Sequence, residues 1–434
     1  MAGRKRVWPV QALLFLVLAR LLFHAFFVPV FEGPDEPFHL GRIAAWADLP
    51  WTRAFIGGPV PREIVASIRA HPCGPDLRRA FDCPPFSGRG AAFNILQSTA
   101  GNGIGQVWEN SENNQPPLHY FVAGLPIRSA ESLRGTSWPA ETRLLLSRLF
   151  SFFLVGLALL WPLRLVAASR SSAWKIAGLV LLLLPGASEA LVRCSNDASV
   201  FLWCSLSMLA LERRPSTWTL AALLVVGPLI KLTAFPIVAV LLVVLWQRGR
   251  VWNTLLGVAC ALLVFPIQLA RGWWWGGTYE LNRPVLPFDE PTLSVAKGIA
   301  RSIYVFVKTV FWLGEWSFFR APILFIVAYF TLIFLWLMHC RVRSNAARAG
   351  AHAAGGAVAL AGFFLFVFAN RRLYGVWGGV GGWYFWTWFP WLSVAATDLL
   401  RLRPTRSHLL VATSVAFVVF SNAAFVWIAF QIYG

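Results

Sequence analysis

The chain has 434 residues, of which 57% are hydrophobic and only 13% are charged, and its formal net charge is +19 at pH 7. A soluble domain usually carries about a quarter charged residues, so this composition excludes an ordinary soluble protein. Apolar runs of about 20 residues, the length that crosses a hydrocarbon core, recur from one end to the other. The sequence therefore predicts an all-α polytopic membrane protein.

The positive charge is concentrated in short clusters between the apolar runs, and no nucleic-acid motif accompanies it. Short loops rich in Lys and Arg stay on the cytoplasmic side of a membrane, so these clusters indicate topology and contact with anionic lipid. They include residues 4–6, 164–175, 213–214, 248–250, 341–348 and 401–406.

Keeping the basic loops cytoplasmic predicts about eleven spans with an external C-terminus. The basic start of the chain resembles a signal peptide, but no small-residue cleavage site follows, so we expect an uncleaved first helix. The expected spans are 8–30, 142–163, 176–191, 198–211, 217–230, 233–247, 251–270, 321–340, 353–369, 383–399 and 409–430.

This topology divides the chain into five parts. Residues 1–30 hold the first transmembrane helix, and residues 31–141 form a large external loop with juxtamembrane helices near 38–47 and 61–70. Residues 142–270 form a transmembrane bundle, residues 271–320 a second external loop with a re-entrant or interfacial helix, and residues 321–434 the last transmembrane helices. The segment 117–133 is too short and too charged to be assigned as a span. Eleven of the 19 acidic residues fall in 31–141, which predicts chemistry on the outer face.

Two cysteines in the external loop, Cys73 and Cys83, are close in sequence and flanked by prolines. An oxidising compartment would join them, so we expect a disulfide. Cys204, Cys260 and Cys340 are expected as small buried hydrophobic residues.

The first candidate site follows directly on the first apolar helix, in the stretch Glu-Gly-Pro-Asp-Glu-Pro-Phe-His at 32–39. Asp35, Glu36 and His39 are placed where the chain leaves the bilayer, and the prolines on either side restrict the backbone. Fixed carboxylates suit a general base or a metal site. The alternative is a helix cap, with Asp35 as the N-cap and Pro37 in the first turn of a helix over 38–48.

Two further polar motifs lie at the same predicted level. Pro116-Pro117 separates Asn114 and Gln115 from a helix that carries His119 and Tyr120, although Asn114 could simply cap that helix. The outer turn at 193–197 contributes Arg193, Asn196 and Asp197, of which the last two could cap the next helix.

Three features place charge at or near membrane depth. Lys231 lies in a broken hairpin, and an ionisable residue there is functional or paired. Arg20 and His24 are one helical turn apart, so they are expected to face protein. Arg371 and Arg372, followed by a glycine-rich stretch ending at Tyr384, fit a phosphate site, although a glycine hinge with interfacial arginines explains them equally well.

The first helix, the Pro-Asp-Glu-Pro-Phe-His stretch and the loop ending in Gln-Pro-Pro-Leu-His-Tyr resemble the membrane-embedded glycosyltransferases of the GT-C superfamily. More narrowly, the chain resembles an uncharacterised bacterial family with Pro-Asp-Glu-Pro-x-His and Pro-Pro-Leu-Tyr-Tyr motifs. Order and spacing agree over about residues 8–250. The chain departs from that family at His119, where Tyr is common, and at Gly382-Trp-Tyr384, where Gly-Arg-Tyr is common, so a phosphate role would move to Arg371 or Arg372.

The resemblance implies that Asp35 is the base or a metal ligand, with Glu36 in support, and that a divalent cation is a candidate cofactor. It also implies a sugar donor on polyprenyl phosphate and a glycan, lipid or protein acceptor. Independently, glycosyl transfer needs a carboxylate to take the acceptor's proton and cations to hold the leaving phosphate, and a single base favours inversion. We expect a bacterial inner membrane enzyme with its site on the outer face. The alternatives are a transporter or flippase for a lipid-linked saccharide and a non-catalytic assembly protein.

Overall fold

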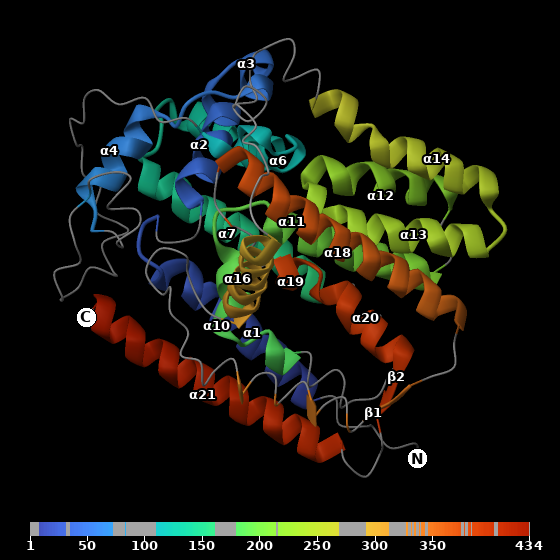
Figure 1. Ribbon diagram of the computed structural model, residues 1–434. Coiled ribbons are helices and arrows are strands. Elements are labelled where there is room, and N and C mark those ends of the chain that lie inside the picture. Colours follow the sequence, from blue (N-terminus) through green and yellow to red (C-terminus); the bar gives the residue numbers. More distant parts are fainter. Residues whose placement is uncertain are drawn as a thin grey trace, which may run out of the picture.

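The computed structural model describes residues 8–31, 35–72, 83, 110–160, 179–213, 216–268, 292–311, 340–342, 346–374, 377, 381–382, 384–402 and 407–433, with isolated positions between 327 and 338. Helices dominate these residues, as the sequence predicts (Figure 1). Their one piece of sheet is an antiparallel pair, in which β1 (Cys340–Val342) lies against β2 (Leu400–Leu402).

The helices in chain order have the following bounds. The first half contains α1 (Trp8–Phe27), α2 (Glu36–Asp48), α3 (Trp51–Ile56), α4 (Arg62–Ala70), the 3-10 helix η2 (Ser111–Asn114), α6 (Leu118–Arg134), α7 (Ala140–Ala158), α10 (Pro185–Val192) and α11 (Asp197–Arg213). The second half contains α12 (Thr217–Ile230), the 3-10 helix η4 (Leu232–Ala234), α13 (Phe235–Gln247), α14 (Val251–Leu262), α16 (Thr292–Phe311), α18 (Ala346–Tyr374), α19 (Tyr384–Thr387), α20 (Phe389–Leu399) and α21 (Ser407–Tyr433).

Three segments of the described chain are long and apolar enough to cross a membrane: Val10–Phe27, Val251–Gln268 and Arg348–Arg372. A fourth crossing is available if α10 and α11, which bend by 98° at the turn between them, count as one broken span. Length and composition thus support a helical membrane protein.

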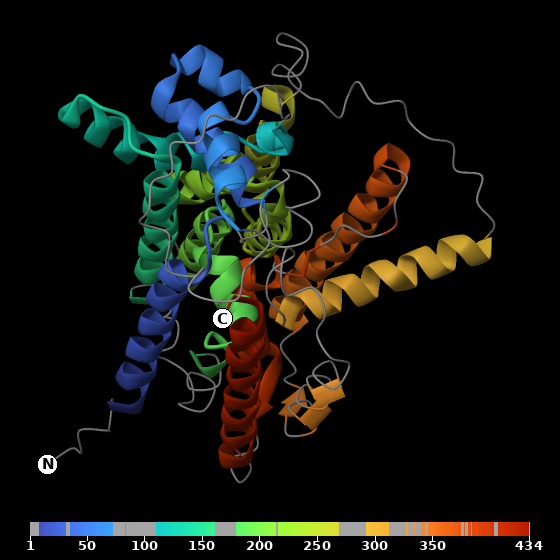
Figure 2. The same ribbon diagram turned by 90° about the vertical axis from the view of Figure 1, so that its left-hand side faces the viewer.

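The short helices of the predicted external loop gather at the end of the molecule opposite the start of α1 (Figures 1 and 2). The sequence predicts α2 and α4 but not α3. A close contact between α6 and α2 holds this layer, because a Cβ on Gly124 would lie 2.7 Å from the Cβ of Trp46 and 3.0 Å from the carbonyl oxygen of Ile43. The layer therefore fixes α2 and α6 side by side.

Three apolar clusters form the core, and polar residues lie where they meet. One joins α1, α7, α10 and α11, a second joins α2, α4 and α6, and a third joins α11, α12 and α13. The turn at 193–196 leads from the first cluster toward the second and third, and Cys194 packs into the second. This turn, the start of α2 and the break before η4 carry the polar residues analysed below.

Several expected spans have different bounds in the structure. The second half of the expected span 176–191 coincides with the short helix α10, because Pro185 starts a new helix there and the chain turns after Val192. The expected span 383–399 is divided into α19 and α20, with a turn at Trp388. The span 353–369 is the middle of the longer helix α18, so Arg371 and Arg372 lie in its last turn. Much of 321–340 lies outside the described residues.

Cys83 is disulfide-bonded. Cys73 lies outside the described residues, so the pairing of these two cysteines stays a prediction. Within the described chain Cys194, Cys204 and Cys260 are free thiols, and Cys204 is buried as the sequence predicts.

Candidate functional site

Asp35 occupies the position before α2, but its side chain does not cap the helix. Its backbone is left-handed, with φ 59°, and no side-chain capping hydrogen bond forms. Phe31 also has a positive φ of 63°, and Pro37 lies in the first turn of α2. The predicted capping role for the Asp35 carboxylate is therefore wrong, whereas the place of Pro37 is confirmed. Non-glycine residues rarely adopt this backbone, which costs on the order of 1 kcal/mol and recurs at functional sites.

Glu36, the neighbour of Asp35, is bound on both carboxylate oxygens. Arg148 of α7 donates from Nε to Oε1 at 2.8 Å and from its terminal nitrogen to Oε2 at 2.5 Å, and the backbone N–H of Cys194 donates to Oε1 at 2.9 Å. Arg148 also donates to the carbonyl oxygens of Val28 and Pro29 at 2.6 and 2.9 Å. Glu36 thus ties α2 to α7, the end of α1 and the 193–196 turn, which is a positioning role.

His39, one turn into α2, faces the loop helix α6 and η2. Its Nδ1 lies 2.8 Å from the hydroxyl of Tyr120, which donates to Oε2 of Glu112 at 2.8 Å. The same Nδ1 lies 3.4 Å from Glu112. The backbone N–H of Glu112 donates to Oδ1 of Asn110, whose side-chain amide donates to the carbonyl of Phe38. Two motifs more than 70 residues apart in sequence therefore form one buried hydrogen-bonded chain.

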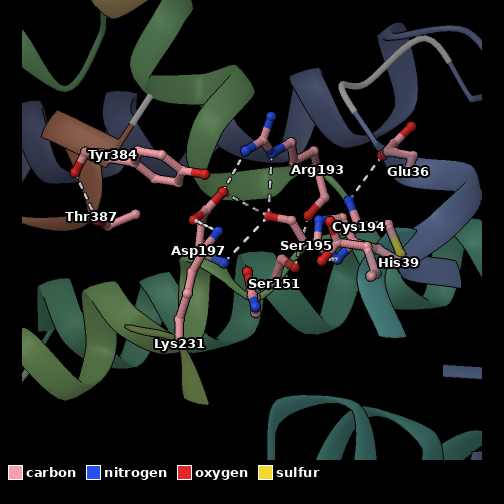
Figure 3. Close-up of polar contacts among 12 residues, drawn as sticks. Glu36, His39, Ser151, Arg193, Cys194, Ser195, Asp197, Lys231, Tyr384 and Thr387 are labelled. Carbon is pink, nitrogen blue, oxygen red and sulfur yellow. Dashed lines mark hydrogen bonds and ion pairs between the residues drawn. The ribbon is translucent and has the colours of Figure 1, made fainter. Parts of the chain in front are cut away.

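Asp197, at the start of α11, is held by two cations (Figure 3). Lys231 donates from Nζ to Oδ1 at 2.6 Å, and Arg193 donates to Oδ2 at 2.5 Å. Nζ of Lys231 also lies 4.9 Å from the ring centroid of Tyr384, a cation–π contact with the C-terminal part of the chain. All three ionic side chains are buried. The expected pairing of Lys231 is confirmed.

These groups form one electrostatic unit, called here the polar cluster: Asp35, His39, Glu112, Tyr120, Arg193, Asp197 and Lys231. Asp35 is within the field of Arg193, Lys231 and Asp197. Glu112 in turn responds to Asp35, Lys231 and Asp197. The structure thus brings the first, second and third motifs together with Lys231.

Burial shifts the ionisation of the polar cluster. It raises the pKa of Glu112 to about 7, and the neighbouring charge of Asp35 adds to the shift. Burial also raises the pKa of Asp35, against the opposing effects of Arg193 and Lys231. Burial and then the charge of Lys231 lower the pKa of His39 well below its usual value and that of His119 to about 3. Both imidazoles are therefore neutral at pH 7.

The remaining predicted residues lie around or away from the polar cluster. Nδ1 of His119 shares a hydrogen bond of 2.8 Å with the hydroxyl of Ser199. The side-chain amide of Asn196 donates to the carbonyl oxygen of Ile230 at 3.5 Å. Gln115 is half-buried beside η2, and Asn114 closes that helix. The last turn of α18, which carries Arg371 and Arg372, stands apart from α2 in Figure 2. The basic groups whose charges act on Asp35 are instead Arg193 and Lys231.

Four residues of this region were not predicted as site residues. Glu112 and Arg148 are described above, and His24 of α1 pairs with Glu189 of α10 at 2.7 Å. His24, Glu36, Arg148, Glu189 and Arg193 surround a packing gap that has no room for a water molecule. A signal existed for Glu112, since it opens the Glu-Asn-Asn-Gln-Pro-Pro motif, and for Arg148, which is a charge within an apolar run.

A metal site does not assemble from the described residues, where no group of three or more His, Cys, Asp or Glu side chains could hold an ion. The positive charges of Arg193 and Lys231, which act on Asp35, also oppose the binding of a divalent cation there. We therefore derive no step through a divalent ion.

Comparisons of the chain with models of protein families, with curated proteins and with solved structures found no match.

Proposed function

We propose that this chain is a membrane-embedded glycosyltransferase, which moves a sugar from a polyprenyl-phosphate donor to an acceptor hydroxyl at the outer face. One observation carries the proposal: the charges of two buried cations, Arg193 and Lys231, act on the Asp35 carboxyl group, where the chain leaves its first apolar helix. A lipid-phosphate donor cannot leave the membrane, so its enzyme needs a site at that level. The predicted topology of about eleven spans puts that level on the outer side.

The chemistry requires one bond to form and one to break at the anomeric carbon. The acceptor oxygen attacks this carbon while its proton passes to a base, and the phosphate leaves with the electron pair of the glycosidic bond. Lys231 and Arg193 are the groups that would stabilise the charge growing on the phosphate. Ammonium and guanidinium groups carry three and five N–H donors, so each can bind Asp197 and a phosphate oxygen together.

Asp35 and His39 are the two candidate bases of the polar cluster. Glycosyl transfer passes through a carbon with cationic character, which a nearby carboxylate also stabilises. Asp35 thus contributes whether or not it takes the proton itself. Because one base suffices for direct displacement, we propose inversion at the anomeric carbon.

The test uses the full chain reconstituted in lipid nanodiscs with a panel of polyprenyl-phosphate sugars carrying a labelled sugar. We expect time-dependent release of polyprenyl phosphate with at least one donor when acceptor glycans are added. Asp35→Asn should abolish most of that release. Glu63→Gln, at a side chain on α4 that is 54% exposed, is the matched control. Donors bound but never consumed by the native chain would contradict the proposal.

A transporter of lipid-linked saccharides is the second candidate, because two helix breaks carry the buried charges. Lys231 lies between α12 and η4, and Arg193 lies at the 98° bend between α10 and α11. Transport sites often form at such discontinuous helices. Movement of an intact labelled lipid-linked sugar across proteoliposomes, without cleavage, would favour this function.

A further inference from the structure

The hydrogen bond described for the side chain of His39 involves Nδ1. This nitrogen lies 2.8 Å from the Tyr120 hydroxyl and 3.4 Å from Oε2 of Glu112, and the two rings stack with centroids 5.8 Å apart. All three residues are buried. The position of the proton on His39 therefore follows from what Tyr120 and Glu112 can donate and accept.

Tyr120 has one hydroxyl proton, and it donates that proton to the carboxylate of Glu112 at 2.8 Å. An ionised carboxylate only accepts, so the Tyr120 oxygen must in turn accept from Nδ1 of His39. A neutral imidazole carries one proton. His39 then carries it on Nδ1 and keeps the lone pair on Nε2.

We infer that Nε2 of His39 takes the proton from the acceptor hydroxyl, and that Tyr120 and Glu112 are positioning residues that hold His39 in the required tautomer. This inference rests on the proposed glycosyl transfer and names which group acts as its base. A base oriented by a second group, which a third group fixes, is a recurring arrangement in catalysis. Asp35 keeps the electrostatic role.

The arrangement also couples the base to the donor. Lys231 and Arg193, after burial, are the largest causes of the low pKa of His39. A donor phosphate between these cations would offset their charge and raise the pKa of His39. The imidazole thus becomes a stronger base once the donor is bound. When it takes the proton of the acceptor hydroxyl it becomes an imidazolium, which the Glu112 carboxylate stabilises.

Protonation of Glu112 reverses the direction of the hydrogen bonds that link His39, Tyr120 and Glu112. A carboxylic acid donates to Tyr120, Tyr120 then donates to Nδ1, and the proton of His39 moves to Nε2, where no lone pair remains for a substrate. Because burial raises the pKa of Glu112 to about 7, this exchange falls near neutral pH. The charged and titratable groups facing His39 and Glu112 are Asp35, Arg42, His119, Tyr120, Arg193, Asp197, Lys231 and Tyr384.

The decisive measurement is the tautomer itself, because it does not depend on activity. The full chain, labelled with ¹⁵N-histidine in nanodiscs, is compared with His39→Gln to assign the His39 signals. Above about pH 8 we expect an N–H at Nδ1 and an unprotonated Nε2, with exchange to Nε2–H as Glu112 is protonated. An N–H at Nε2 in the native chain at that pH would overturn the inference.

Two variants sharpen the result. Tyr120→Phe alone leaves Nδ1 3.4 Å from the Glu112 carboxylate, which can still accept from it. The double variant Tyr120→Phe/Glu112→Leu removes both acceptors, so His39 should lose its preference for Nδ1–H, whereas Tyr304→Phe, on an exposed part of α16, should change nothing. If the double variant fails to fold, Glu112→Gln replaces it. The Gln amide does not titrate, so its hydrogen bond with Tyr120 is the same at every pH, and the tautomer of His39 should then no longer change near pH 7.

Activity gives a second, separable readout. With a consumed donor, kcat/KM of the native chain should fall about tenfold per pH unit below about pH 7, as for one essential ionisation. Glu112→Gln should remove that limb of the pH profile and have a lower plateau. An unchanged pH profile in Glu112→Gln would refute the control of His39 by protonation of Glu112. If no donor is consumed, the proposed function fails, while the tautomer measurement still tests whether Tyr120 and Glu112 fix the proton on Nδ1 of His39.

Discussion

The junction between α2 and α7 and the polar cluster beside it both bury charge, yet they use it differently. At the junction, Glu36 has both oxygens bound by Arg148 and a backbone N–H, and the carboxylate is fully buried. In the polar cluster, Asp35 has a left-handed backbone and no capping bond, and the pKa of Glu112 is raised to about 7. A buried carboxylate whose oxygens are all paired holds helices together, whereas a carboxyl group with a shifted pKa can exchange a proton near neutral pH.

The comparison is sharpest at two adjacent residues. Asp35 and Glu36 differ by one methylene group and one position in sequence. Glu36 pairs with Arg148 of α7, whereas Asp35 is subject to the charges of Arg193 and Lys231. Substitutions at the two regions should therefore separate stability from activity.

The largest effect on stability is expected from Arg148→Met. It leaves Glu36 buried without its ion pair and removes donors from the carbonyls of Val28 and Pro29, so we expect a loss of about 3–5 kcal/mol. Thermal unfolding of the purified full chain in detergent measures this. The double variant with Glu36→Met should recover much of the loss, and a single variant as stable as the native chain would break the comparison.

Asp35→Asn should have the opposite signature. It removes the charge opposite Arg193 and Lys231 and keeps the side-chain volume, so we expect a roughly 10²–10³-fold drop in kcat for a consumed donor. Thermal stability should change by less than about 1 kcal/mol. Steady-state kinetics with parallel melting curves checks both, and equal losses of activity and stability would place Asp35 with Glu36 as a structural residue.

Glu112→Gln tests the pH dependence of stability. The folded chain raises the pKa of Glu112 from 4.5 to about 7, so it holds this proton more tightly than the unfolded chain does. The resulting stabilisation is present below about pH 4.5 and is lost as pH rises to about 7, a change of about 3 kcal/mol. Melting curves across this range should show the loss in the native chain and not in Glu112→Gln. Parallel curves for the two proteins would contradict the raised pKa.

The smallest effect is expected at the other end of α2. Arg143 of α7 binds Asp48 through two hydrogen bonds of 2.7 Å, but the Asp48 side chain is 35% exposed. Arg143 also keeps Glu131 at 2.8 Å. Asp48→Asn should therefore cost only about 0.5–1 kcal/mol in the same melting assay, because water screens and replaces the pair. A loss of stability near that of Arg148→Met would mean that solvent exposure does not explain the difference between the Arg143–Asp48 and Arg148–Glu36 pairs.

The sequence correctly predicted the class of the molecule and several of its polar positions. Apolar runs predicted α1, α12 and α13 within about three residues of their observed bounds, because a helix satisfies every backbone hydrogen bond of an apolar segment internally. Of these, only α1 is long enough to cross a membrane, since α12 and α13 have 14 and 13 residues. Of the two predictions for Lys231, functional or paired, the structure confirms the pairing. Local rules sufficed for these features.

The site depends on long-range contacts, and there local rules were incomplete. The capping role of Asp35 failed, since capping is a local preference, and its neighbour Glu36 is bound by Arg148, 112 residues away. The position of Arg371 and Arg372 depended on where α18 ends, which the glycine pattern did not specify.

The sequence by itself determined that the chain is helical and apolar enough to cross a membrane, and that its carboxylates concentrate after the first helix. Only the tertiary structure decided which carboxylate is bound and which faces cations, and it alone revealed Glu112 beside His39 and Tyr120. The physical reason is that hydropathy and helix period act over one or two turns, whereas ionisation and hydrogen-bond partnership depend on which distant helices pack together.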